Sequence, residues 1–91
     1  MSFGSLIVAD GQIESYQVES DTVDLRFKEF RGGFFRITFF GVTELVQSQA
    51  LGFDLSEGRE LKTEGKAEVT FLDSDGPVLR IRCDRYRIDP E

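Results

Sequence analysis

Residues 22–40 read TVDLRFKEFRGGFFRITFF, and this stretch decides the fold. Apolar residues alternate with charged ones from Val23 to Lys28, and the apolar side chains of Phe35, Ile37 and Phe39 repeat this spacing, which is typical of strands with one buried face. Gly32-Gly33 separates the two runs, and glycine readily takes the positive φ angles of a tight turn. We therefore predict one antiparallel hairpin made of residues 22–30 and 34–40.

A second hairpin is predicted at the start of the chain. Asp10-Gly11 is a dipeptide that favours a tight hairpin turn, and it follows a short apolar run at residues 6–9. Residues 12–19 follow the dipeptide directly. We therefore predict that residues 6–9 and 12–19 form a pair of strands.

A third hairpin is predicted near the C-terminus. Apolar and polar side chains alternate through residues 67–71 and again through residues 79–83. The segment between them, residues 74–77, reads SDGP, which is a turn sequence, and a proline is tolerated at the beginning of a strand. This pattern predicts two antiparallel strands joined by a short turn.

The alternation of the last strand changes parity after Cys83. Tyr86 and Ile88 fall on even positions, whereas the apolar residues before them fall on odd positions. One extra residue at Asp84-Arg85, forming a β-bulge, would return both side chains to the core face. We therefore expect an irregularity in the chain at that point.

One short helix is predicted in the middle of the chain. Thr43 can cap a helix N-terminus, and Glu44 would lie in the first turn, where a negative charge is favourable. Leu45 and Val46 would pack against the sheet, and Gly52 would end the helical segment. A helix this short needs such packing because isolated short helices are marginal in water.

The remaining segment and the fold class follow from these elements. Residues 53–65 mix charges, glycine and a few apolar residues, which predicts an irregular connection with Phe53 and Leu55 in a short edge strand. Residues 1–91 are predicted to form a single domain of mainly β class. The expected architecture is a single small antiparallel sheet, a sandwich or a barrel of about six strands with one short helix.

The composition describes a short acidic chain. Its 91 residues contain 17 Asp and Glu against 11 Lys and Arg, so the formal net charge is −6, and there is no histidine. The chain therefore lacks the side chain that most often transfers protons near neutral pH and most often binds metals. We predict a protein that is not an enzyme and that uses no cofactor.

The predicted location is the cytoplasm. No apolar stretch approaches the roughly 20 residues that span a membrane, and the first residues lack the basic region of a signal peptide. Cys83 is the one cysteine, which fits a reducing compartment better than a disulfide-stabilised secreted domain. No membrane association is expected.

Two local features are weak candidates for chemistry. Cys83 shares the parity of Leu79 and Ile81, which favours a buried and inert thiol, although neighbouring arginines could activate an exposed one. Asp73–Gly76 is similar to the opening of a calcium loop, but the twelfth position of such a loop would fall inside a predicted strand. No metal site is predicted.

The strand at residues 34–40 is apolar on both faces. Phe34 and Phe40 lie opposite to Phe35 and Phe39, and Arg36 lies between them on the second face. The helix, the 53–65 connection or the closure of a barrel could cover this second face. Alternatively, the face is a contact with a second copy or with another protein. The predicted partner-binding residues are Phe34, Arg36 and Phe40.

A run of arginines in the last strands offers an alternative site for nucleic acid. Its candidate residues are Arg80, Arg82, Arg85 and Tyr86. The net charge of −6 repels polyphosphate, so nucleic acid is an unfavoured partner, and pairing with acids such as Glu68 or Asp24 is the preferred interpretation. The preference would weaken if Arg26, Lys28 and Arg36 shared one face.

Several segments resemble small uncharacterised bacterial β-rich domains, some of them grouped with polymorphic-toxin immunity proteins. The segments that carry this resemblance are Val23–Phe27, Arg36–Phe39, Val42–Leu45 and Leu79–Cys83. The resemblance implies a cytoplasmic binding module, and an acidic module is compatible with blocking a basic nuclease or another toxin. The predicted order of five strands with a helix after the third also resembles the oligonucleotide/oligosaccharide-binding barrel.

The function predicted from the sequence is binding rather than catalysis. The preferred hypothesis is a non-catalytic protein-interaction module that associates with itself as a homodimer or inhibits a protein partner. The alternative hypothesis is a module that binds single-stranded nucleic acid or a small ligand on one face of a barrel. A third hypothesis is an enzyme that uses only carboxylates, Tyr16, Tyr86 or backbone groups.

Overall fold

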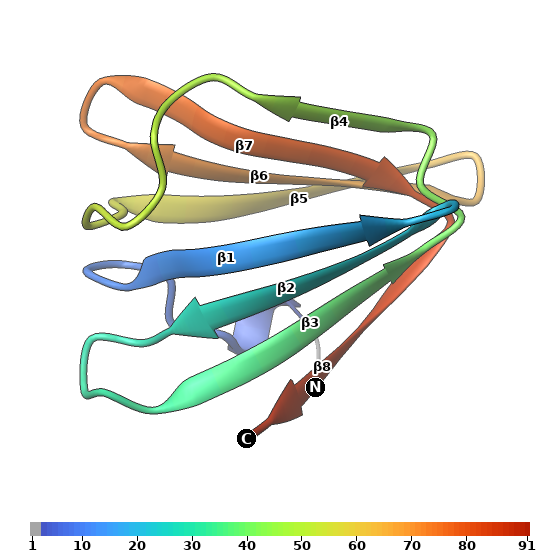
Figure 1. Cartoon of the computed structure of the whole chain (residues 1–91). Helices are drawn as coiled ribbons and strands as arrows, with labels where there is room; N and C mark the ends of the chain where they lie inside the picture. Colours follow the sequence, from blue (N-terminus) through green and yellow to red (C-terminus); the bar gives the residue numbers. More distant parts are fainter. Residues whose placement is uncertain (1–2) are drawn as a thin grey trace.

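The alternating runs of the sequence form strands whose apolar sides meet between two antiparallel sheets (Figure 1). The computed structural model describes residues 3–91. The elements are a short 3₁₀ turn η1 (Phe3–Ser5) and the strands β1 (Gln12–Glu19), β2 (Thr22–Lys28), β3 (Phe34–Phe40), β4 (Glu44–Gln47), β5 (Glu57–Thr63), β6 (Lys66–Asp73), β7 (Gly76–Cys83) and β8 (Arg85–Pro90). The first sheet, sheet A, has the order β1-β2-β3-β8, and the second, sheet B, has the order β4-β7-β6-β5.

Two neighbouring segments of the chain run through both sheets. β3 pairs with β8 in sheet A, and the continuation of this pair, β4 with β7, lies in sheet B. The two segments change sheets side by side, at Gly41–Thr43 and at Asp84, where the layers converge in Figure 1. The Asp84 N–H donates to the Phe40 carbonyl at 2.9 Å across this bend. The two sheets are therefore joined by a bent two-stranded ribbon.

One hydrophobic core fills the space between the sheets. Phe27 of sheet A stacks with Phe71 of sheet B, with ring centroids 6.3 Å apart. Phe3 of the N-terminal segment meets Phe71 edge to face at 5.6 Å. Buried residues come from both sheets and from both termini, so the N-terminal segment is part of the core.

The hairpin predictions are largely confirmed. β3 has the predicted bounds, β2 ends two residues earlier than predicted, and Gly32 takes a φ of 93° in the turn between them. The strand predicted at residues 12–19 is β1, and the C-terminal hairpin is β6 with β7. Residues 6–9, however, do not form a strand: Leu6 and Val8 enter the core from an irregular segment, with Val8 beside β5, and Ile7 is 45% exposed.

The predicted short helix is wrong, because the segment forms strand β4. The spacing of Leu45 and Val46 suits a helix, but these residues also alternate between a half-buried and an exposed position. The Thr43 N–H donates to the Arg82 carbonyl at 2.9 Å, which begins the pairing of β4 with β7. Backbone pairing with a neighbouring strand thus overrides a marginal local preference for helix.

The predicted irregular connection is also partly wrong. Residues 57–63 form the edge strand β5, and a tight turn at Glu64-Gly65, with φ angles of 49° and 78°, joins it to β6. Leu55 is buried as expected, but Phe53 is 68% exposed and lies outside any strand.

The expected change of parity occurs at Asp84, but it accompanies a change of sheet rather than a bulge within one strand. Ile88 is buried, and Tyr86 packs against the core, as predicted. The mainly β prediction is confirmed, with eight strands in two sheets instead of about six in one. The five-stranded barrel order is therefore wrong for this chain.

Candidate binding face

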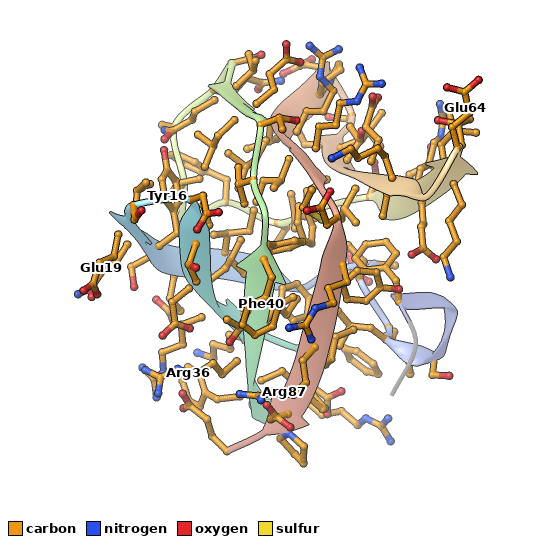
Figure 2. The ribbon with its side chains drawn as sticks, turned by 90° about the vertical axis from the view of Figure 1, so that its right-hand side faces the viewer. Tyr16, Glu19, Arg36, Phe40, Glu64 and Arg87 are labelled. Atoms are coloured by element: carbon orange, nitrogen blue, oxygen red, sulfur yellow. The ribbon has the colours of Figure 1, made fainter. Side chains whose placement is uncertain are left out.

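The outward face of sheet A gathers positive charge around two aromatic rings. Cross-strand pairing places Lys28 opposite Phe34, and Arg85 opposite Phe40. The residues of this surface, called the basic face below, are Arg26, Lys28, Phe34, Arg36, Phe40, Arg85 and Arg87. They include five of the 11 Lys and Arg of the chain. Arg36, Phe40 and Arg87 lie over the same half of the molecule in Figure 2, far from Glu64.

Each ring of the basic face lies beneath a guanidinium group. The Arg26 Cζ lies 3.8 Å from the ring centroid of Phe34, and the Arg85 Cζ lies 4.4 Å from that of Phe40. Arginine over an aromatic ring is a favourable cation–π arrangement. The second apolar face of β3 is thus covered by arginine side chains, not by a helix, the 53–65 connection or barrel closure.

Two arginines of the basic face stand directly opposite each other. Arg26 of β2 pairs in register with Arg36 of β3, and like charges in this position are unfavourable. Each has a carboxylate partner: Glu91 is 3.0 Å from Arg26, and Asp24 is 3.1 Å from Arg36. These ion pairs are exposed and contribute little to stability.

Of the remaining cations of the face, Arg85 and Arg87 are exposed and Lys28 is partly buried. Arg87 pairs with Asp89 at 2.7 Å. Within residues 3–91, Lys28 and Arg85 form no ion pair and contact the rings of Phe34 and Phe40 instead. Their charges are available to a negatively charged partner.

The structure does not bring together the four residues predicted to bind nucleic acid. Arg80 and Arg82 project from the outer face of sheet B, where Arg80 pairs with Glu44 at 2.7 Å and Arg82 lies opposite Glu68. Arg85 belongs to the basic face. The change of sheet at Asp84 divides the predicted basic strip, because side chains before and after it project from different layers.

The fourth of these residues, Tyr86, faces inward. Its ring packs against Phe3 and Phe39, and its hydroxyl accepts the Phe3 N–H at 2.9 Å. Burial, followed by the neighbouring Glu60 carboxylate, raises the pKa of Tyr86 to about 12. Tyr86 therefore holds the N-terminal segment in place and offers no ring for stacking on a ligand.

Cys83 is fully buried, as its parity predicted. Burial, with a smaller effect of the Asp84 and Glu60 charges, raises the pKa of its thiol to about 11. The protonated thiol is therefore the dominant form at neutral pH, and this cysteine is a poor nucleophile.

Sequence reasoning placed Phe34, Arg36 and Phe40 on one face but did not include Arg26, Lys28 and Arg87 among the site residues. Only the pairing of β2 and β8 with β3 brings these cations together. The one available signal is the shared parity of Arg26 and Lys28 within β2, which places them on one side of that strand.

Comparisons of the chain with protein-family models, with curated proteins and with solved structures found no match. Among residues 3–91, no helix has the length and apolar character required to cross a membrane.

Proposed function

We propose that this protein is a non-catalytic protein-interaction module and that its basic face binds an acidic surface of another protein. The observation that carries this proposal is the concentration of five cations and two half-buried phenylalanine rings on one sheet face of a chain with a net charge of −6. Arginine and aromatic side chains are the residues that dominate binding energy at protein interfaces.

The unfavourable pairing of Arg26 with Arg36 supports a binding role. A solvated face needs no such pair, and substituting one arginine by a neutral residue would remove the repulsion. A carboxylate from a partner would lie between the two guanidinium groups and convert the repulsion into attraction. Glu91 and Asp24 offset this repulsion in the free protein, and a partner carboxylate would add a bond to both arginines.

The basic face is less suited to pairing with itself. A two-fold axis brings the same patch of two copies together, so Lys28 and Arg85 of one copy would approach the same cations of the other. Of the two modes of interaction predicted from the sequence, binding to a different protein is the better supported.

Single-stranded nucleic acid is the second candidate ligand. The specific observation in its favour is that Arg26, Lys28 and Arg36 share one face with two aromatic rings, as nucleic-acid-binding sheets require. Against it, Arg26 and Arg85 already cover the two rings, and base stacking needs an open ring face.

The test compares two fluorescent probes, a Glu- and Asp-rich peptide without aliphatic residues and a single-stranded oligothymidine. We expect wild type to bind the peptide at low salt and the Arg26→Gln/Arg36→Gln variant to bind it about tenfold more weakly by fluorescence anisotropy. The control variant Lys62→Gln/Arg82→Gln removes the same charge elsewhere and should bind almost as wild type does. Urea unfolding of both variants checks that each remains folded, because the first variant loses the Arg26–Phe34 contact together with the like-charge pair.

Three outcomes would contradict the proposal. Equal losses of peptide affinity in both variants would show that the peptide is attracted by charge anywhere on the protein rather than by the basic face. Tight oligothymidine binding that weakens steeply with salt would favour the nucleic-acid alternative. Failure of the wild type to bind the acidic peptide would remove the charge-based argument.

A further inference from the structure

Sheet A ends on one side at strand β1, and part of the outer edge of this strand has no neighbour. A two-residue turn joins β1 to β2, which makes Glu19 and Thr22 a hydrogen-bonded pair. Such pairs alternate along an antiparallel ladder, so Tyr16 and Val18 direct their N–H and C=O groups away from β2. Among residues 3–91, no other backbone segment hydrogen-bonds to these four groups. Figure 2 shows Tyr16 and Glu19 at the margin of the molecule.

The open part of this edge has defined limits. The Gly52 N–H donates to the Ile13 carbonyl at 3.1 Å, so a loop covers the beginning of β1. Residues 14–19 remain open, up to the turn that leads into β2. Val18 within them is 60% exposed. An open strand edge that carries an exposed apolar side chain is a template for pairing with another strand.

The other three sheet edges are better protected against such pairing. Natural sheets protect their edges by short strands, by charged side chains, by proline or by a covering segment. β4 has only four residues, and β5 carries four charged side chains in seven residues. β8 ends at Pro90, and the N-terminal segment bonds to its Tyr86 hydroxyl. In contrast, residues 15–18 of β1 carry no charge, so β1 is the least protected edge.

The open edge of β1 is complementary to itself. A two-fold axis at Gln17 places Tyr16 opposite Val18 of a second copy, and each of the two resulting pairs exchanges two backbone hydrogen bonds. An aromatic ring beside a β-branched side chain is a favourable cross-strand pair. Ser15 then lies opposite Glu19 of the second copy, so no like charges stand directly opposite each other.

Shifted registers fit this edge less well. An axis at Val18 would extend the pairing past Glu19 into the turn, where the chain leaves the edge. An axis at Tyr16 would include Glu14, where the register of β1 with β2 shifts. The axis at Gln17 is the one that uses only the open and regular part of the strand.

We propose that two copies of this chain pair through β1 and join their A sheets into one antiparallel sheet of eight strands. The two-fold axis runs through the sheet, so the outer faces lie on the same side and the dimer presents two basic faces together. The inference goes beyond the proposed function because the contact uses the edge of β1, not the basic face, and needs no other protein. Each copy has a net charge of −6, so added salt strengthens the pairing.

Disulfide trapping in the full chain tests the register. Gln17 meets Gln17 of the second copy in a non-hydrogen-bonded pair, whose Cα atoms are roughly 4.5 Å apart and within reach of a disulfide. We expect Gln17→Cys to form a disulfide-linked dimer at about 0.5 mM protein under mild oxidation. The matched control Ser15→Cys is equally exposed but lies opposite Glu19, so it should form roughly tenfold less dimer. Cys83 is fully buried and takes no part.

Sedimentation at two salt concentrations tests the pairing itself. Val18→Pro removes an N–H that the chain does not use internally, and proline is tolerated where the N–H of an edge strand faces solvent. We expect wild type to dimerise more strongly at the higher ionic strength and Val18→Pro to weaken the dimer at least about tenfold, with its β-sheet circular dichroism retained. Val18→Thr keeps the donor and the β-branched shape, so it should keep most of the dimer.

Three outcomes would overturn the proposal. Equal trapping of Gln17→Cys and Ser15→Cys would show random collision rather than strand pairing. A monomeric wild type at about 0.5 mM, together with no trapped Gln17→Cys dimer, would leave the β1 edge without a second copy. A dimer that Val18→Pro retains and that Phe34→Ser with Phe40→Ser abolishes would place the contact on the basic face. If Val18→Pro loses its β-sheet signal, the trapping comparison decides the question.

Discussion

At the scale of single residues, the Tyr86 hydroxyl joins the N-terminal segment to the last strand. It accepts the Phe3 N–H, while the Phe3 ring meets both Tyr86 and Phe71 edge to face. Gly58 of β5 lies against the same segment, where an added Cβ would approach the Phe3 ring to 2.6 Å. A few specific contacts thus fix an irregular segment that has no strand pairing of its own.

Replacing Tyr86 with Phe should reveal this contact through the pH dependence of stability. At neutral pH the Phe3 N–H loses its acceptor, and the free energy of unfolding should fall by about 1 kcal/mol. The pKa of Tyr86 is raised from 10 to about 12 in the folded state, so its contribution is complete below pH 10 and is lost as pH rises through 12. In urea unfolding, the free energy of unfolding should therefore fall more steeply at alkaline pH for wild type than for Tyr86→Phe. Equal slopes would contradict the raised pKa, and Cys83, present in both proteins, cancels from the comparison.

At the scale of elements, the bent ribbon of β3–β4 and β7–β8 determines which side chains share a face. Gly41 takes a φ of 65° at the bend, and Asp84 lies directly against it. Lys66 forms an ion pair with the same Asp84 carboxylate, which links β6 to the bend. Because of this bend, Arg80 and Arg82 project from sheet B, whereas Arg85 projects from sheet A.

Gly41→Ala should destabilise the protein more than a matched glycine substitution elsewhere. Its Cβ would lie 2.2 Å from Asp84 Oδ2 in a backbone conformation that L-residues avoid, and we expect a loss of about 2–3 kcal/mol in the free energy of unfolding. Gly52→Ala has a positive φ of 90° but no atom within 4 Å, so it reports the backbone cost alone, about 1 kcal/mol. Urea unfolding followed by circular dichroism measures both, and equal losses would show that the bend tolerates a side chain.

The fold could be predicted from the sequence where local signals act alone. Gly32-Gly33 and two-residue alternation define β2 and β3 because a buried sheet face fixes strand register. The β4 segment was assigned wrongly because its short apolar pattern suits both a helix and a strand, and only pairing with β7 selects the strand. Edge strand β5 is not predicted because its positions opposite buried residues of β6 hold Gly58, Glu60 and Lys62, so the segment has no apolar alternation.

The candidate site could be predicted only in part, because the local sequence does not show which strands pair with each other. Parity places Phe34, Arg36 and Phe40 on one side of β3 without knowledge of its neighbours. That Arg85 covers Phe40, however, depends on a change of sheet between distant segments. No local pattern contains that information, because it arises from packing of the whole chain.

At the scale of the whole molecule, charge is distributed unevenly between the surfaces. The basic face carries an excess of cations, the outer face of sheet B carries both signs, and acids such as Asp54 and Asp75 lie in the connections between strands. An acidic protein with one positive face approaches a negatively charged partner in a preferred orientation. This distribution favours binding to a different molecule over self-association through the basic face.

Truncating the two rings of the basic face distinguishes packing within the chain from contact with a second copy. Phe34 and Phe40 are half-buried beneath Arg26 and Arg85, so Phe34→Ser with Phe40→Ser should remove apolar burial and four cation–π contacts. We expect the free energy of unfolding to fall by about 2–4 kcal/mol, with no change of mass in sedimentation and with the β-sheet circular dichroism retained. A dimeric wild type that the double substitution converts to a stable monomer would instead place a second copy on this face. Such a dimer would bring the cations above each ring close to those of the second copy. Added salt screens this repulsion, so the dimer should become more stable at higher ionic strength. Sedimentation at two ionic strengths would detect the change.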